Sequence, residues 1–275
     1  MSIRPSPIAG TWYPGDSEQL KKTVSDHISQ AEISGFNGEP LALISPHAGY
    51  LYSGSTAGHA FKLVQGRSYD LVVVISPFHN YHPDNILISS YEAYSTPLGN
   101  IPIDREIIVQ MNSFLEGSIG KGITSITHEK EHSLEIILPF LQVTLTNNFK
   151  LLPIMLSGNN YQCADAVGKF LAQLAQKKNI LMVASTDLSH FHDLKTANRL
   201  DTNLLEQFSS MNIKKIISTI TASEGEACGI MAVLSVLTAC KLLNAKELKI
   251  LKYTTSAEMT GDKNSVVGYA SAVIA

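Results

Sequence analysis

Three apolar runs of this 275-residue chain end in serine and are followed within a few residues by histidine. Runs of Val, Ile and Leu that end in Ser, Pro or Gly predict buried strands, here at 41–45, 71–76 and 180–185. The histidines that follow are His47, His79 and His190. Because the carboxyl ends of parallel strands lie along one edge of a sheet, where ligands bind, we expect these imidazoles to converge.

One histidine after a strand often only caps a turn, but three at equivalent positions favour a shared site. Neutral imidazole is the commonest protein ligand for zinc, iron and copper. Two imidazoles leave a metal short of ligands, and Cys228 is the remaining candidate, at the predicted start of an apolar helix over 227–243. A helix N-terminus favours the thiolate that binds metal. The alternative for Cys228 is a small buried residue at a tight helix start.

Two further pairs combine a carboxylate with an imidazole. Asp187 precedes His190 by three residues and could orient it for acid–base chemistry, unless it caps the next helix. His132 and Glu135 would share one face of a helix predicted over 132–145, as part of a pocket wall or simply as an acidic helix start. We therefore expect catalytic roles for His190 and Asp187 and ligand contacts for His132 and Glu135.

The aromatic residues near the N-terminus have two interpretations. Trp12, the only tryptophan, and Tyr52 could line a pocket at the sheet edge. Alternatively, Trp12 plugs the end of the sheet.

The apolar runs alternate with helical patterns, which predicts an α/β fold. Runs without polar alternation are typical of parallel strands that are covered on both faces. The C-terminal segments 248–256 and 265–274 predict a hairpin added to this sheet. No linker or repeat divides the chain, so we expect one domain over 1–275, with a mostly parallel central sheet flanked by helices. The remaining predicted strands are 86–90 and 150–156, and the remaining predicted helices are 16–30, 54–64, 104–114, 161–176 and 196–208.

The composition excludes several classes of protein. With 44% hydrophobic and 16% charged residues and a net charge of -3, the chain is neither disordered nor suited to coating nucleic acid. It has no apolar run of the roughly 18 residues that span a bilayer, and no signal peptide. Its three cysteines fit a reducing compartment, so we expect a cytoplasmic protein without nucleic-acid or membrane partners.

Several motifs, in order along the whole chain, resemble the Memo family, which in prokaryotes is called AmmeMemoRadiSam system protein B. The segments that carry the resemblance are Gly10-Thr11-Trp12-Tyr13-Pro14, Ser45-Pro46-His47-Ala48-Gly49-Tyr50, Ser76-Pro77-Phe78-His79, Glu131-His132-Ser133, Ser185-Thr186-Asp187, His190 and Cys228-Gly229.

The resemblance implies a domain similar to class III extradiol ring-cleaving dioxygenases, whose iron is held by two histidines and a carboxylate. By motif, His47 and His79 match the metal imidazoles, Cys228 takes the place of the carboxylate, and His190 matches the acid–base histidine. Trp12 and Tyr52 match aromatic positions at the pocket mouth. The cysteine departs from the dioxygenase pattern, and a softer ligand shifts the preference toward copper or zinc.

These observations support three functions. The leading hypothesis is a dioxygenase-like redox protein that holds iron, or copper, through His47, His79 and Cys228. The second is a non-catalytic pocket protein for a small molecule or a phosphotyrosine-like peptide, and the third is a zinc hydrolase. The prokaryotic family name also implies a pathway shared with a radical-SAM protein.

Overall fold

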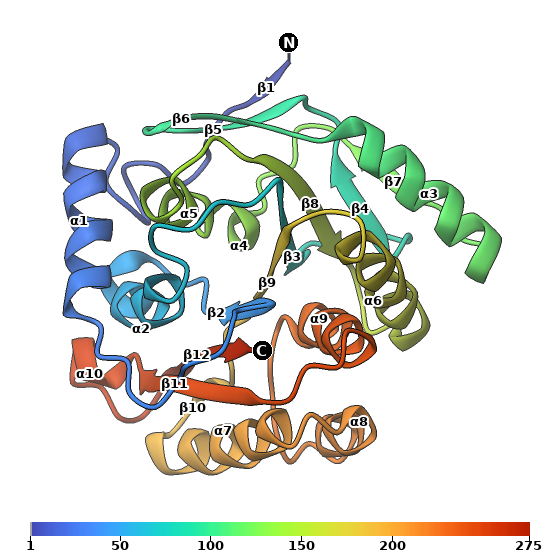
Figure 1. Ribbon diagram of the computed structural model, residues 1–275. Coiled ribbons are helices and arrows are strands. Elements are labelled where there is room, and N and C mark those ends of the chain that lie inside the picture. Colours follow the sequence, from blue (N-terminus) through green and yellow to red (C-terminus); the bar gives the residue numbers. More distant parts are fainter. Residues whose placement is uncertain (1) are drawn as a thin grey trace.

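Four parallel strands form the centre of the molecule. The computed structural model describes residues 2–275, and its main sheet has nine strands (Figure 1). Its central strands pair in the order β2-β9-β3-β8, all parallel, and nearly every residue in them is buried. Their bounds are β2 (Ala42–Ser45), β3 (Leu71–Pro77), β8 (Lys150–Leu156) and β9 (Ile180–Ser185). The predicted parallel core is thus confirmed.

Antiparallel strands extend this core on both sides. The long strand β12 (Val266–Ile274) pairs with β2 and with its hairpin partner β11 (Leu248–Thr255), which confirms the predicted C-terminal hairpin. Strand β10 (His190–His192) also pairs with β12. On the other side, β4 (Ile86–Ser89) is antiparallel to β8 and parallel to β7 (Thr124–Ile126). The sheet is therefore mixed.

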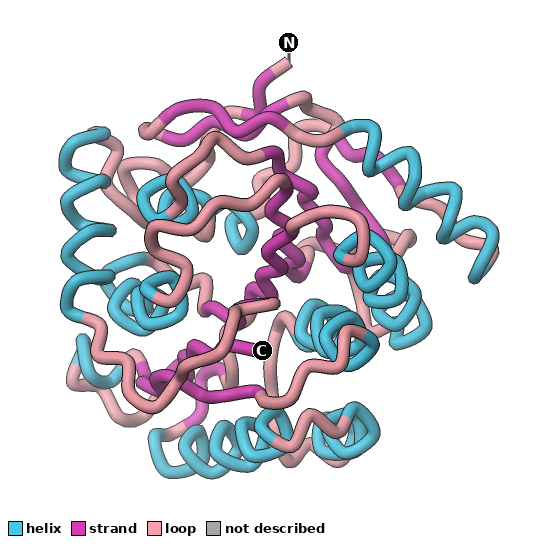
Figure 2. The backbone as a smooth tube through the Cα atoms, viewed as in Figure 1, coloured by secondary structure: helices cyan, strands magenta, loops and turns pink. Residues whose placement is uncertain are grey.

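Helices cover both faces of the sheet, and Figure 2 shows the strands passing between two groups of helices. One group is α1 (Ser17–Gln30), α2 (Tyr50–Lys62), α4 (His132–Glu135) and α5 (Leu138–Thr144). The opposite group is α3 (Arg105–Ile119), α6 (Tyr161–Ala175) and α9 (Ile230–Leu242). Three further helices, α7 (Leu194–Ser209), α8 (Ile213–Thr221) and α10 (Ala257–Thr260), lie near the C-terminal hairpin.

A small second sheet contains the N-terminal strand. It consists of β1 (Ile3–Arg4), β5 (Ala93–Thr96) and β6 (Gly99–Pro102), in the order β1-β5-β6. These strands have two to four residues each and contain no continuous apolar run, and they are absent from the sequence-based expectation.

Two predicted helix boundaries are wrong in ways that affect the site. The helix expected over 132–145 is two helices, because Pro139 in the first turn of α5 has no N–H to continue a longer helix. The helix expected from residue 227 begins at Ile230, so Cys228 lies in the loop before it. Among residues 2–275, no helix is long and apolar enough to cross a membrane.

Candidate metal centre

A cavity of about 550 Å³ opens where the central strands end. Its lining comes from the N-terminal segment with Thr11 and Trp12, from the loops after β2, β3 and β9, and from the first residues of α2, α4, β10 and β12. Histidines lie at its inner end and aromatic and apolar residues form its walls. None of the residues that line it is a lysine or an arginine. The cavity therefore offers imidazoles, one carboxyl group and apolar surface to a ligand.

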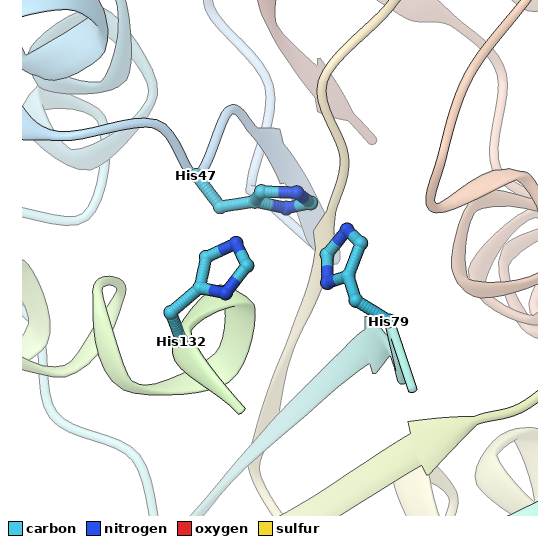
Figure 3. A group of neighbouring side chains, drawn as sticks. All are labelled: His47, His79 and His132. Atoms are coloured by element: carbon cyan, nitrogen blue, oxygen red, sulfur yellow. The ribbon is translucent and has the colours of Figure 1, made fainter. Parts of the chain in front are cut away.

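Three imidazoles meet at this cavity. His47, His79 and His132 each present a nitrogen, and these nitrogens all lie within 4.8 Å of one another (Figure 3). The ring centroids are 5.3 Å apart for His47 and His79, and 4.6 Å apart for His79 and His132. Each ring comes from a different element: the loop after β2, the loop after β3, and the first residue of α4. This grouping is suited to a single metal ion.

His47 is the most buried of the three, with 2% of its surface exposed. Its Nδ1 lies 2.9 Å from Ser185 Oγ at the end of β9. Its backbone N–H donates to Asp187 Oδ1 over 2.7 Å. Burial first, and then the neighbouring His79 and His132, hold the pKa of His47 well below its usual value. The ring is therefore neutral, as a metal ligand must be.

His79 is held by Glu131. Its Nδ1 lies 2.9 Å from Glu131 Oε1, and its backbone N–H donates to Glu131 Oε2 over 2.8 Å. Burial lowers the pKa of His79, but the hydrogen bond and the charge of Glu131 outweigh it and the pKa is raised. Burial likewise opposes ionisation of Glu131, yet its hydrogen bonds with His79 and with the Ser133 N–H bring its pKa well below the usual range. A buried carboxylate therefore orients this imidazole.

Cys228 contacts the histidine group from one side only. Its Sγ lies 3.2 Å from His47 Nε2, but the sulfur is not part of the mutually close group of three imidazoles. Burial, and then the charge of Asp187, raise the pKa of the Cys228 thiol far above its usual value. The expectation that a helix N-terminus favours the thiolate is wrong here, because α9 begins after Cys228 and burial dominates.

The carboxyl group of Asp187 is hydrogen-bonded to the loop that carries His47 and does not orient His190. Its carboxyl group accepts the His47 N–H, and Oδ2 lies 3.9 Å from His47 Nε2. Within residues 2–275, no hydrogen bond or ion pair joins Asp187 to His190. The expectation that Asp187 orients His190 is therefore wrong. Burial raises the pKa of Asp187 to about 7, even though the His47 N–H and the charge of His79 lower it. Burial lowers the pKa of His190, which lines the same cavity.

The predicted pocket residues divide into two groups. Trp12, Tyr52 and His132 line the cavity, and the Trp12 ring lies 4.4 Å from the His132 ring. Glu135 is not among the lining residues. It is fully buried and accepts hydrogen bonds from Arg4 and Tyr13, which corrects its expected ligand role.

Sequence reasoning missed other residues of the site. Glu131 belongs to a quoted motif, and its place beside His132 is the signal that could have found it. Ser185, the last residue of a predicted strand, also belongs to a quoted motif, and its place two residues before Asp187 is its signal. The remaining lining residues that were missed are Thr11, Ala48 and Gly49, which belong to quoted motifs, and Leu51, Val267 and Tyr269, which do not.

Comparison with known proteins gives consistent matches over the full length. The model of the Memo family, described as "Memo-like protein", matches residues 4–273. A "MEMO1 family protein" of Nitrosopumilus maritimus is 34% identical, covering 97% of this chain and 98% of the relative. A "MEMO1 family protein" of Methanosarcina mazei is 31% identical over 100% of both chains.

Among solved structures, the crystal structure of uncharacterized protein JW3007 from Escherichia coli K12 aligns with a TM-score of 0.46 and 15% identity. The alignment covers 85% of this chain and 99% of that one. The family match and the sequence relatives together show that this chain belongs to the Memo-like protein family.

Proposed function

We propose that this protein is a metal-dependent oxidoreductase of dioxygenase-like type, acting on a small molecule in the cavity. One observation carries the proposal: three imidazole nitrogens within 4.8 Å of one another at a cavity large enough for a small ligand. Such sites hold a metal and leave coordination positions open toward the ligand.

The donor set fits a first-row transition metal. In this proposal His47 and His79 bind the metal whichever residue supplies the third donor, and we call them the constant ligands. As the side chains stand, His132 is the third donor, because its nitrogen is close to both other rings. Cys228, which the family resemblance implies, reaches the same ion only after its thiol loses a proton and moves toward His79. Imidazoles accommodate iron, copper and zinc, and we propose iron as the functional metal.

Other residues of the cavity handle the ligand and its protons. When bound, iron or copper would supply one-electron chemistry toward oxygen and substrate. Asp187, with a pKa of about 7, can hold or release a proton near neutral pH, and His190, whose pKa burial lowers, can accept a proton as a neutral base. Trp12 and Tyr52 offer flat apolar walls for a ligand.

Anaerobic purification with elemental analysis tests this proposal. We expect bound metal in the wild type and its loss in His79→Ala. Comparing His132→Ala with Cys228→Ser identifies the third ligand, because only its removal strips the metal. Iron-loaded protein should consume oxygen in the presence of a substrate, and zinc-loaded protein should not. A wild-type protein without metal affinity would refute the proposal.

A zinc hydrolase is the second candidate, favoured by the same three imidazoles, since three histidines and a water form a known catalytic zinc site. Hydrolysis of ester or amide probes by zinc-loaded protein would support it. The phosphotyrosine-like ligand is less well supported, because no lysine or arginine lines the cavity to pair with a phosphate.

The cellular context follows from the family and remains part of the proposal. We propose a cytoplasmic protein that shares a pathway with a radical-SAM protein. Co-purification of the two from cells would test this link.

A further inference from the structure

The tautomer of His47 is determined by a chain of two hydrogen bonds. A serine hydroxyl has one hydrogen to donate. Ser185 Oγ donates it to the backbone carbonyl of Ser133, over 2.6 Å. Toward His47 Nδ1, 2.9 Å away, the same oxygen can therefore only accept. Nδ1 must carry the proton of the neutral ring, which leaves Nε2 as the acceptor atom, with Cys228 Sγ 3.2 Å away from it.

The tautomer of His79 is determined in the same sense by a carboxylate. An ionised carboxylate only accepts hydrogen bonds. Glu131 Oε1 lies 2.9 Å from His79 Nδ1, so this nitrogen also carries the proton. In the neutral ring, Nε2 is therefore the unprotonated atom of His79. Both constant ligands of the proposed site thus share one tautomer, although they lie on different strand ends.

One short segment supplies both constraints. Glu131 orients His79, and the carbonyl of Ser133 orients Ser185, which orients His47. The segment is itself fixed: the Ser133 N–H donates to Glu131 Oε1 over 2.9 Å, and Ser133 Oγ donates to the Pro77 carbonyl at the end of β3 over 3.0 Å. His132, the middle residue of the segment, lines the cavity, and Glu131 and Ser133 on either side of it are buried.

We propose that Glu131-His132-Ser133 sets the Nδ1–H tautomer of His47 and His79, with Ser185 as a positioning residue, so that both Nε2 atoms are available to a metal. This inference rests on the proposed function in one respect, that the ion is bound through Nε2. The hydrogen bond made by one ring nitrogen decides which tautomer a histidine adopts, and outer partners of this kind commonly change metal affinity.

The test compares Ser185→Ala with Ser76→Ala in the full-length protein. Ser76 is a matched control, because it too is a fully buried serine at the end of a central strand, and its hydroxyl donates only to the neighbouring Pro77 carbonyl. Histidine-selective ¹⁵N NMR of metal-free protein reads the tautomer of each ring directly. A Co²⁺ titration then measures metal affinity in the same three proteins.

We expect Nδ1–H rings for His47 and His79 in the wild type and in Ser76→Ala. In Ser185→Ala, His47 should become a mixture of tautomers while His79 keeps its own. The dissociation constant for Co²⁺ should rise about 10- to 100-fold in this variant alone. An Nε2–H ring at His47 in the wild type, or an unchanged tautomer in Ser185→Ala, would overturn the inference.

The NMR measurement separates this inference from the proposed function. If the wild type shows the expected tautomers but binds no Co²⁺, Fe²⁺ or Zn²⁺, the tautomer assignment stands and the proposed metal site is wrong. If the metal binds but Ser185→Ala has the affinity of the wild type, the metal site stands and the positioning role of Ser185 is wrong.

Discussion

Two polar clusters both include side chains of residues 129–135, and they differ in how their polar atoms are used. In the arginine cluster (Arg4, Glu129, Glu135), the guanidinium of Arg4 donates to both carboxylates and to the carbonyl of Glu131, and lies over the Tyr94 ring. In the histidine cluster (His47, His79, His132), each ring lines the cavity. The charged groups of the arginine cluster are thus paired with one another, whereas the rings of the histidine cluster are open to a ligand in the cavity.

The difference follows from charge. A buried guanidinium or carboxylate is tolerated only when it is paired and fully hydrogen-bonded, which leaves the arginine cluster no spare group for chemistry. Neutral imidazoles cost less to bury and can keep a nitrogen free. Glu131 connects the two clusters, because Arg4 Nη2 donates to its carbonyl over 2.7 Å and its carboxylate holds His79. The arginine cluster thus fixes the segment on which the histidine cluster depends.

Removing the cation of the arginine cluster should have the largest effect. Arg4→Met leaves Glu129 and Glu135 buried without their partner, with 2% and 0% of their side chains exposed. We expect the free energy of unfolding in urea to fall by about 3–5 kcal/mol. Arg4→Lys, which keeps the charge but not the fork of donors, should lose less. A loss below about 1 kcal/mol in Arg4→Met would show that the cluster is not essential to stability.

Metal removal should come next and should act only through the histidine cluster. Zn²⁺ at about 100 times its dissociation constant should stabilise the wild type by about 2.7 kcal/mol, because it binds the native state. Chelation should reverse this gain. In His79→Ala, which removes a side chain that is 35% exposed, thermal unfolding should be insensitive to Zn²⁺ and to chelator. An equal response in both proteins would place the metal elsewhere.

The connection between the clusters should have an intermediate effect. Glu131→Gln keeps the shape of the side chain but places an amide NH₂ group where Glu131 now offers an acceptor oxygen, and it removes the charge beside His79. We expect the Co²⁺ dissociation constant to rise about 10- to 100-fold. The exposed Glu106→Gln on α3 is the control and should bind Co²⁺ like the wild type. Unchanged affinity in Glu131→Gln would mean that the two clusters are independent.

The smallest signal should come from the cavity wall. Trp12 is the only tryptophan, and its ring lies 4.4 Å from the His132 ring. Co²⁺ bound at the histidine cluster should quench its fluorescence, whereas Zn²⁺, with a filled d shell, should change it little. The same titration in His79→Ala should show no saturable quenching. Saturable quenching in that variant would indicate a second metal site near Trp12.

Much of the fold could be predicted from local patterns. The central strands were found because continuous apolar runs are typical of parallel strands covered on both faces, and the predicted and observed bounds of 150–156 and 180–185 coincide. Short strands such as β1 and β10 were not predicted, because a segment of two or three residues carries no hydrophobic pattern. Helix α8 also escaped, although Ile213, Ile216, Ile217 and Ile220 recur at helical spacing.

The candidate site was predicted only in part. The sequence predicted that His47, His79 and His190 lie at one edge of the sheet. This was possible because the position of a histidine just after a strand depends only on its neighbours along the chain. The partner of Asp187 was wrong, because a spacing of three residues says nothing about which of two nearby rings the carboxyl group faces. The predicted thiolate form of Cys228 was wrong as well, because the pKa of the thiol depends on its burial, and burial is a property of the packed molecule.

The sequence by itself thus determined the central strands and most of the longer helices, the family, and which strand ends carry imidazoles, since each of these depends on residues that are neighbours along the chain. Only the tertiary structure decided that His132 joins His47 and His79, that Arg4 pairs with Glu129 and Glu135, and that Ser185 reaches His47. These partners are separated by 53 to 138 residues. Their contacts depend on strand order and loop path, which no local pattern contains.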